Sequence, residues 1–126
     1  MIAPLRLPEA LDRADALDRV AVPVFDRLAD TLGGSPAATL LQGRWLGHPL
    51  HPVLTDVPIG CWTSAWLIDV FGREEHDDIA TWFVGLGVIA AVPTALTGWA
   101  SWLRLPPDLR RTGVVHAGAN SVATAL

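Results

Sequence analysis

The sequence lacks the residue patterns that most enzymes use for chemistry. Its one cysteine, Cys61, lies within an apolar run, so no disulfide or paired-cysteine site forms within these residues. There is no nucleophile motif, no glycine-rich phosphate loop and no carboxylate pair at a recognisable spacing. These absences argue against catalysis by this chain alone.

Charge is also scarce. All nine basic residues are arginine, and the formal net charge is −4. No basic stripe is present, so we do not expect a nucleic-acid partner. The N-terminus lacks a basic region followed by an apolar core and a cleavage site, which argues against a cleaved secretory signal.

The clearest positive feature is a long run without any charged residue. It extends from Ile79 to Leu103, between Asp78 and Arg104, in a chain whose mean hydropathy is +0.36. A bilayer core needs roughly 20 apolar helical residues to be crossed, so this run predicts a membrane span. Pro93 lies inside it, and we expect a kink rather than a break there.

A weaker first span is predicted from Pro52 to Phe71. Thr55 or Asp56 would cap its helix, with Pro58 in the first turn. Asp56 and Asp69 would then lie near the two interfaces, where a carboxylate costs less than in the hydrocarbon core.

A third apolar stretch, Val114 to Leu126, is too short to cross and is expected to be part of a span that continues beyond this chain. The sequence therefore predicts an all-α integral membrane helical bundle of two full spans and an incomplete third. We expect residues 45–126 to form this membrane domain.

Residues 1–44 are predicted to form an amphipathic helical arm and a linker. Apolar residues recur three and four apart between Pro8 and Leu32, and Pro23 is expected to start a second short helix. Gly33 and Gly34 would end that helix. The arm either lies on a membrane or a partner, or packs on the rest of the chain.

The distribution of arginines predicts an orientation in the membrane. One side of the two spans carries Arg44, Arg104, Arg110 and Arg111, whereas the loop between the spans, 72–78, carries Arg73 alone. By the positive-inside rule, the N-terminus and the loop 104–113 face the cytoplasm, and loop 72–78 faces outward.

This topology would bring three histidines to the cytoplasmic side. His48 and His51, each before a proline and so expected outside the helix, precede the first span, and His116 begins the third element. Neutral imidazole binds haem iron or metal ions and donates hydrogen bonds to quinones, with Asp56 and Asn120 placed to orient it. Alternatively, the histidines only shape the loops.

Three blocks of sequence carry a family resemblance: residues 46–60 (LGHPLHPVLTDVPIG), 91–99 (AVPTALTGW) and 111–120 (RTGVVHAGAN). Together they closely resemble the bacterial domain-of-unknown-function family 2231. The resemblance implies a multi-pass protein of the bacterial inner membrane, with about four spans. The final family span is missing from this chain.

The resemblance also implies functional residues and partners. The family's motif histidines fall on His48, His51 and His116, and its motif polar residues on Asp56 and Asn120. Some members are fused to a Rieske-type iron–sulfur domain, which implies electron transfer, but this chain has no Cys/His pattern for such a cluster.

Three functional hypotheses follow. The first is a membrane module or anchor linked to electron transfer, which binds haem, a metal ion or a quinone and contacts other membrane subunits or a Rieske-type domain. The second is a purely structural membrane subunit. The third is a soluble all-α domain with residues 79–103 as its central helix.

Overall fold

The computed structural model describes residues 14–72 and 76–126, and every regular element within these ranges is helical. The predicted all-α class is therefore confirmed. The first residues of the predicted arm, 8–13, lie outside the described residues. The elements are η1 Asp15–Leu17, α2 Asp18–Leu32, α3 Pro36–Leu41, η2 Arg44–Leu46, α4 Leu50–Phe71, α5 Asp77–Trp102 and α6 Pro107–Ala125.

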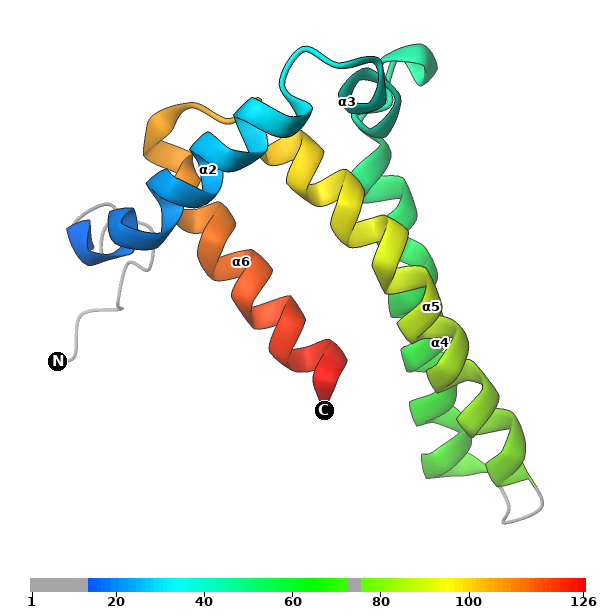
Figure 1. Cartoon of the computed structure of the whole chain (residues 1–126). Coiled ribbons are helices and arrows are strands. Elements are labelled where there is room, and N and C mark those ends of the chain that lie inside the picture. The colour runs from blue at the N-terminus through cyan, green and yellow to red at the C-terminus, as the bar shows by residue number, and fades with distance from the viewer. Residues whose placement is uncertain (1–13, 73–75) are drawn as a thin grey trace, which may run out of the picture.

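The arm is formed by η1 and α2, and it packs on the rest of the chain. Its apolar side is turned inward, with Ala21 only 1% exposed, while charged residues such as Asp26 and Arg27 are exposed. Figure 1 shows α2 lying across the ends of α5 and α6. Of the two placements left open by the sequence, the structure has the arm packed against its own chain.

Two expectations about the N-terminal part were wrong. Helix α2 continues through Pro23. Pro23 cannot donate to the Arg19 carbonyl, but it lies on the exposed side of the helix, where water or a lipid headgroup can bond that carbonyl instead. The expected linker contains α3, because the hydroxyl of Ser35 accepts a hydrogen bond from the Ala38 N–H at 3.0 Å and Pro36 starts the helix. The end of α2 at Gly33 is as predicted.

Helix α4 begins at Leu50, before the predicted start. Neither Thr55 nor Asp56 caps it, and Pro58 lies buried in its interior. His51 is helical, contrary to the prediction, because Pro52 falls in the first turn, where a missing N–H breaks no bond. His48 stays in a non-helical turn, as expected.

Helices α4 and α5 form an antiparallel hairpin and lie side by side along their length (Figure 1). Buried residues are spaced seven apart along much of this contact, at Pro58 and Ala65 in α4 and at Ala80, Gly87 and Thr94 in α5, and the end of α5 also buries Thr97, Ala100 and Trp102. A seven-residue repeat keeps one seam of each helix against the other, and small residues let the backbones approach closely.

Not every small residue of the hairpin lies in this seam. Gly87 is buried against the Trp62 ring, so close that a Cβ atom would overlap it. Gly60 has open space around it and Ala95 is exposed, so neither belongs to the seam.

Helix α5 runs through Pro93 without a break. Within the described residues, α5 is the one helix that is long and apolar enough to cross a membrane, and only 17% of its most apolar window is buried in the structure. A central helix of a soluble domain would be mostly buried. The exposed apolar surface of α5 therefore argues against the soluble alternative.

Helix α6 is largely separate from the hairpin. None of its residues is buried, and Figure 1 shows its C-terminal end apart from α5. It meets α5 at its start, where Gly113 lies against the Trp102 ring with no room for a Cβ atom. The indole Nε1–H of Trp102 donates to the Arg110 carbonyl at 3.1 Å. The start of α6 is thus held, and the rest extends away.

We predict that Gly87→Ala destabilises the hairpin. The added methyl overlaps Trp62, and overpacking of this kind costs about 1–3 kcal/mol. Unfolding in mixed detergent micelles measures the loss. Gly85→Ala in the same helix meets nothing within 4 Å and should leave stability unchanged or raised. Equal losses in the two variants would show that Gly87 is not a packing position.

Candidate ligand-binding site

His51 is held by a hydrogen bond between the two helices of the hairpin. Its Nδ1 lies 2.9 Å from the Thr94 carbonyl oxygen, and a carbonyl only accepts, so Nδ1 carries the proton. The Nε2 atom of a neutral His51 therefore has a free lone pair. A carbonyl partner that fixes the tautomer in this way is typical of histidines that bind a metal or another ligand through the opposite nitrogen.

The segment of α5 after Pro93 is shaped to receive this ring. A Cβ atom on Gly98 would lie 2.9 Å from His51 Cε1 and 3.0 Å from Nδ1, so a larger residue there would press on the imidazole. Thr97, which is 1% exposed, donates its hydroxyl to the Thr94 carbonyl at 2.8 Å. These residues fall in the sequence block 91–99, but sequence reasoning did not identify Thr94 or Gly98 as part of a site.

His116 lies beside His51 although it comes from α6. The two ring centroids are 6.3 Å apart and the ring planes meet at 88°, an edge-to-face arrangement. We call these two residues the imidazole pair. The structure thus brings together two of the histidines singled out in the sequence, from helices that are distant along the chain.

Asn120 contacts His116 mainly through the helix backbone. Its amide nitrogen donates to the His116 carbonyl at 2.8 Å and lies 3.3 Å from each ring nitrogen. Being equally far from both, it cannot lie along the lone pair of either. Asn120 is therefore next to the imidazole pair but does not select a tautomer of His116.

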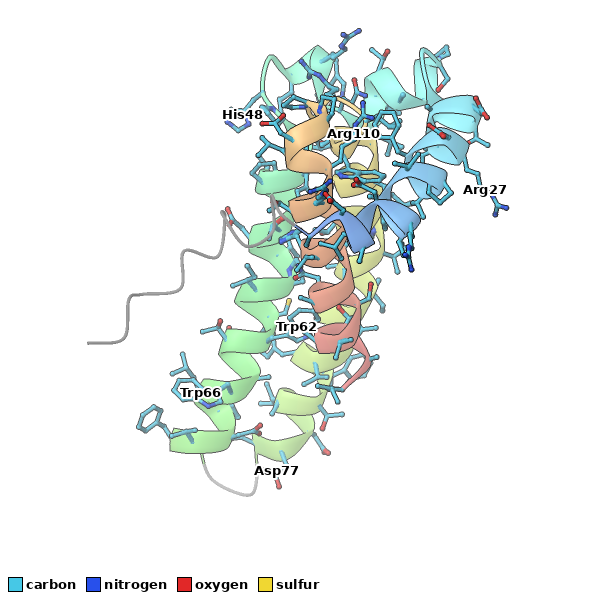
Figure 2. The ribbon with its side chains drawn as sticks, turned by 90° about the vertical axis from the view of Figure 1, so that its left-hand side faces the viewer. Arg27, His48, Trp62, Trp66, Asp77 and Arg110 are labelled. Carbon is cyan, nitrogen blue, oxygen red and sulfur yellow. The ribbon has the colours of Figure 1, made fainter. Side chains whose placement is uncertain are left out.

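His48 and Asp56 lie outside this pair. His48 is exposed, its Nδ1–H donates to the Pro49 carbonyl at 2.9 Å, and Figure 2 shows it on the outside of the molecule. Asp56 is also exposed, and the orienting contact expected from it is made by Thr94. Within residues 14–72 and 76–126, no three His, Cys, Asp or Glu side chains form a group that could hold a metal ion.

An ion pair between the arm and α6 helps to position His116. Arg111 donates to both carboxylate oxygens of Asp18, at 2.8 and 2.6 Å, and to Asp15 at 2.8 Å. The Arg111 side chain is 17% exposed, so water screens it less than a fully exposed cation. The hydrogen bond from Arg111 lowers the pKa of Asp18, and Asp18 in turn raises the pKa of Arg111.

An aromatic contact adds to this attachment. The Arg110 guanidinium lies 3.5 Å from the centroid of the Phe25 ring, and Phe25 meets Trp102 edge-on at 5.5 Å. Both contacts fasten the start of α6 to α2 and to the end of α5. His116 follows little more than one helical turn after Arg111, so its place beside His51 depends on them.

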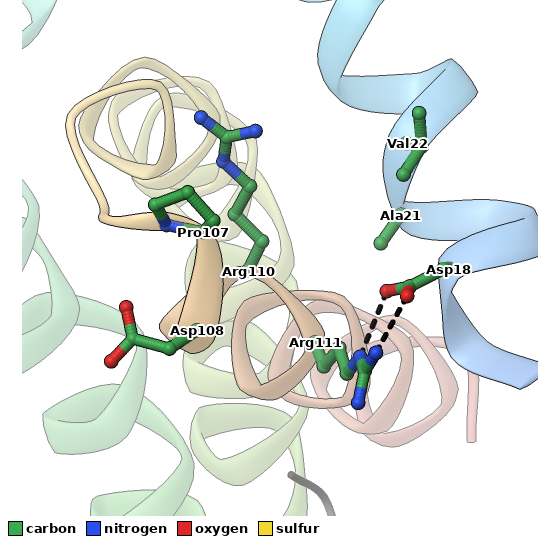
Figure 3. Close-up of a pocket in the computed structure, with 7 residues that line it drawn as sticks. All are labelled: Asp18, Ala21, Val22, Pro107, Asp108, Arg110 and Arg111. Carbon is green, nitrogen blue, oxygen red and sulfur yellow. Dashed lines mark hydrogen bonds and ion pairs between the residues drawn. The ribbon is translucent and has the colours of Figure 1, made fainter. Parts of the chain in front are cut away.

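A cavity of about 380 Å³ lies between α2 and the start of α6 (Figure 3). Its lining includes the Asp18–Arg111 ion pair as well as Asp108 and Arg110, so charges of both signs face it. The imidazole pair does not line this cavity. We therefore place the candidate site at the histidines rather than here.

We predict that attachment of the arm weakens in acid. Because the folded pKa of Asp18 is lowered from 3.8, the ion pair contributes fully above that value and is lost as the pH falls through the folded pKa. In a Cys61→Ala background, the distance between nitroxide labels at positions 27 and 122 should broaden in acid. Asp18→Asn should show the broad distribution at neutral pH, and Asp26→Asn should behave as wild type. A narrow distribution in Asp18→Asn would refute this attachment.

Comparison with known proteins supports the resemblance seen in the three sequence blocks. The family model described as "Predicted membrane protein (DUF2231)" matches residues 47–126, which include both members of the imidazole pair and leave the arm outside. No significant match is found among curated proteins or among solved structures. The chain therefore belongs to the DUF2231 family of predicted membrane proteins.

Proposed function

We propose that both helices of the hairpin cross the membrane. With 22 residues and a rise of about 1.5 Å per residue, α4 is about 33 Å long, enough for a hydrocarbon core of about 30 Å. Because α4 packs along α5, the two helices would lie at the same depth. Large apolar side chains on the outside of α4, among them Ile59, Trp66 and Val70, are exposed as lipid-facing residues would be.

The proposed orientation follows from charge. Arg44, Arg104, Arg110 and Arg111 belong to the end of the hairpin that carries the arm, and these positively charged residues favour the cytoplasm. We therefore infer a multi-pass protein of the bacterial inner membrane, with residues 45–126 as the membrane domain. The arm, within residues 1–44, would cover its cytoplasmic end.

We further propose that the imidazole pair binds an electron-transfer ligand at that end. The observation that carries this proposal is the His51 tautomer. The carbonyl of Thr94, 43 residues further along the chain, fixes the proton on Nδ1 and leaves Nε2 free, and the His116 ring lies next to the His51 ring. Two imidazoles supply two of the four ligands of a tetrahedral metal ion, so a bare ion fits poorly. Haem, whose iron has four porphyrin nitrogens of its own, or a quinone, which accepts hydrogen bonds, fits better.

A structural role is the second candidate, and the same hydrogen bond supports it. The hydrogen bond from His51 to the Thr94 carbonyl joins α4 to α5. An interhelical hydrogen bond of this kind would help to hold the hairpin together even without a ligand. The module would then serve as an anchor for other membrane subunits or for a redox domain. Ligand binding separates the two candidates.

We predict saturable binding of haemin or a ubiquinone analogue to the protein in detergent. His51→Ala and His116→Ala should weaken it by at least the roughly 10–100-fold that loss of an outer-shell partner costs at metal sites. The Soret band reports haem, and competition with a fluorescent quinone reports the alternative. His48→Ala is the matched control, because His48 lies outside the pair, and should bind as wild type.

Absence of saturable binding to the wild-type protein would remove the ligand proposal. If His51→Ala instead lowers the melting temperature while no ligand binds, the structural candidate is correct. Equal loss in His48→Ala and His51→Ala would show that the pair is not the binding site.

The topology makes a separate prediction. In intact bacteria and a Cys61→Ala background, a membrane-impermeant maleimide should label a cysteine at Asp78 but not one at Trp45, since these positions lie near opposite ends of the hairpin. Both should react after the cells are opened. Labelling of both positions in intact cells would exclude two crossings with the proposed orientation.

A further inference from the structure

A second cavity, of about 240 Å³, lies where α2, α3 and the end of α5 meet. Two arginines line it, Arg44 just before α4 and Arg104 just after α5. Its other polar lining residues are Thr39 and Gln42, and no carboxylate is among its lining residues. We call it the arginine cavity. Its lining thus carries two positive charges and no negative one.

Within residues 14–72 and 76–126, neither arginine has a counter-ion. Among the described residues, no ion pair or side-chain hydrogen bond is formed by Arg44 or Arg104, whereas Arg111 is paired with Asp18 and Asp15. Arg44 and Arg104 are both exposed and both line this cavity, so an anion bound there would lie near two positive charges. A guanidinium binds phosphate oxygens through paired N–H groups better than it binds most other anions.

On the topology proposed above, the arginine cavity would lie at the depth of the lipid headgroups. Arg104 follows the end of α5, the candidate membrane-spanning helix, by two residues. Trp45 and Leu46 directly follow Arg44 and are 64% and 46% exposed. Exposed tryptophan beside arginine at the end of an apolar helix is typical of the membrane interface.

We propose that the arginine cavity binds the phosphate group of an anionic phospholipid headgroup through Arg44 and Arg104. The acyl chains would then run along the exposed apolar side of the hairpin, beginning near Leu46. Gln42 is not available as a main ligand, because its amide nitrogen donates to the Ala100 carbonyl at 3.0 Å, which instead ties this segment to α5. The proposal does not depend on a ligand at the imidazole pair.

The test is binding of phosphatidylglycerol to the 126-residue chain in detergent, compared with phosphatidylcholine, by native mass spectrometry. The wild-type chain should prefer phosphatidylglycerol. Arg44→Gln and Arg104→Gln should each reduce that preference about fivefold, since one basic residue near anionic lipid contributes about that factor. The double variant should lose about 25-fold if the two contributions add.

Arg27→Gln is the matched control, because Arg27 is exposed on α2 (Figure 2) and is not among the residues that line the cavity. It should keep the wild-type preference. An equal loss in Arg27→Gln would mean that overall charge decides lipid binding, and would overturn the site. A circular dichroism spectrum and melting temperature like those of wild type exclude misfolding of the glutamine variants.

Inorganic phosphate separates the two possible sources of the phosphate group. Millimolar phosphate should not displace phosphatidylglycerol, because the free ion lacks the apolar contacts of the acyl chains. Displacement by phosphate alone, with the same dependence on Arg44 and Arg104, would make the cavity a free-phosphate site and overturn the lipid assignment. No difference between wild type and the double variant would overturn both.

Discussion

The hairpin and the candidate site both depend on the way that Thr94 connects α4 to α5. Pro58 has no N–H, so the Leu54 carbonyl lacks its usual partner in α4, and the Thr94 hydroxyl lies 3.1 Å from it. The same hydroxyl lies 2.8 Å from the Ala90 carbonyl of its own helix. The Thr94 carbonyl, in turn, receives the His51 imidazole. In lipid no water can replace such partners, so proline is tolerated where a neighbouring helix supplies a donor.

This arrangement explains how Pro58 is accommodated inside α4. Pro58 is buried in the seam of the hairpin and therefore close to α5, where a threonine hydroxyl is within reach. A leucine at position 94 would leave the Leu54 carbonyl unpaired in an apolar surrounding. The polar contacts of the seam are concentrated toward the arm end, where His51 and Thr94 meet, and the middle of the seam is packed by Trp62 against Gly87.

The arm has a different part in the structure. It contacts α6 mainly through charge and an aromatic ring, with Asp18 on Arg111 and Phe25 under Arg110. The start of α6 is also held by Trp102 of α5, which donates a hydrogen bond to the Arg110 carbonyl and packs on Gly113. The arm and the end of α5 therefore together determine where His116 lies relative to His51. The arm is outside the family match, which begins at residue 47, whereas the Arg111 that it contacts is inside it.

Part of the fold could be predicted from local sequence. The run 79–103 predicted α5 because an uncharged segment of that length favours a helix in lipid. Gly33 ends α2 at a point where a Cβ atom would overlap the Ala29 carbonyl, and Gly34 follows with a positive φ. The starts of helices were less predictable. Pro52 was expected to keep His51 out of the helix, yet a proline in the first turn loses no hydrogen bond, and His51 is helical. Pro23 was expected to divide the arm and does not.

The candidate site shows the same division. The sequence by itself determined the apolar helix, the family and the histidines at which to look, because these depend on residue type and spacing along the chain. Only the tertiary structure decided that His116 lies beside His51 while His48 does not, and that a carbonyl of α5 rather than Asp56 holds the His51 ring. The physical reason is that every backbone carbonyl is a possible acceptor whatever its side chain. Which carbonyl contacts an imidazole depends on how two helices pack against each other, and that packing cannot be read from residue types alone.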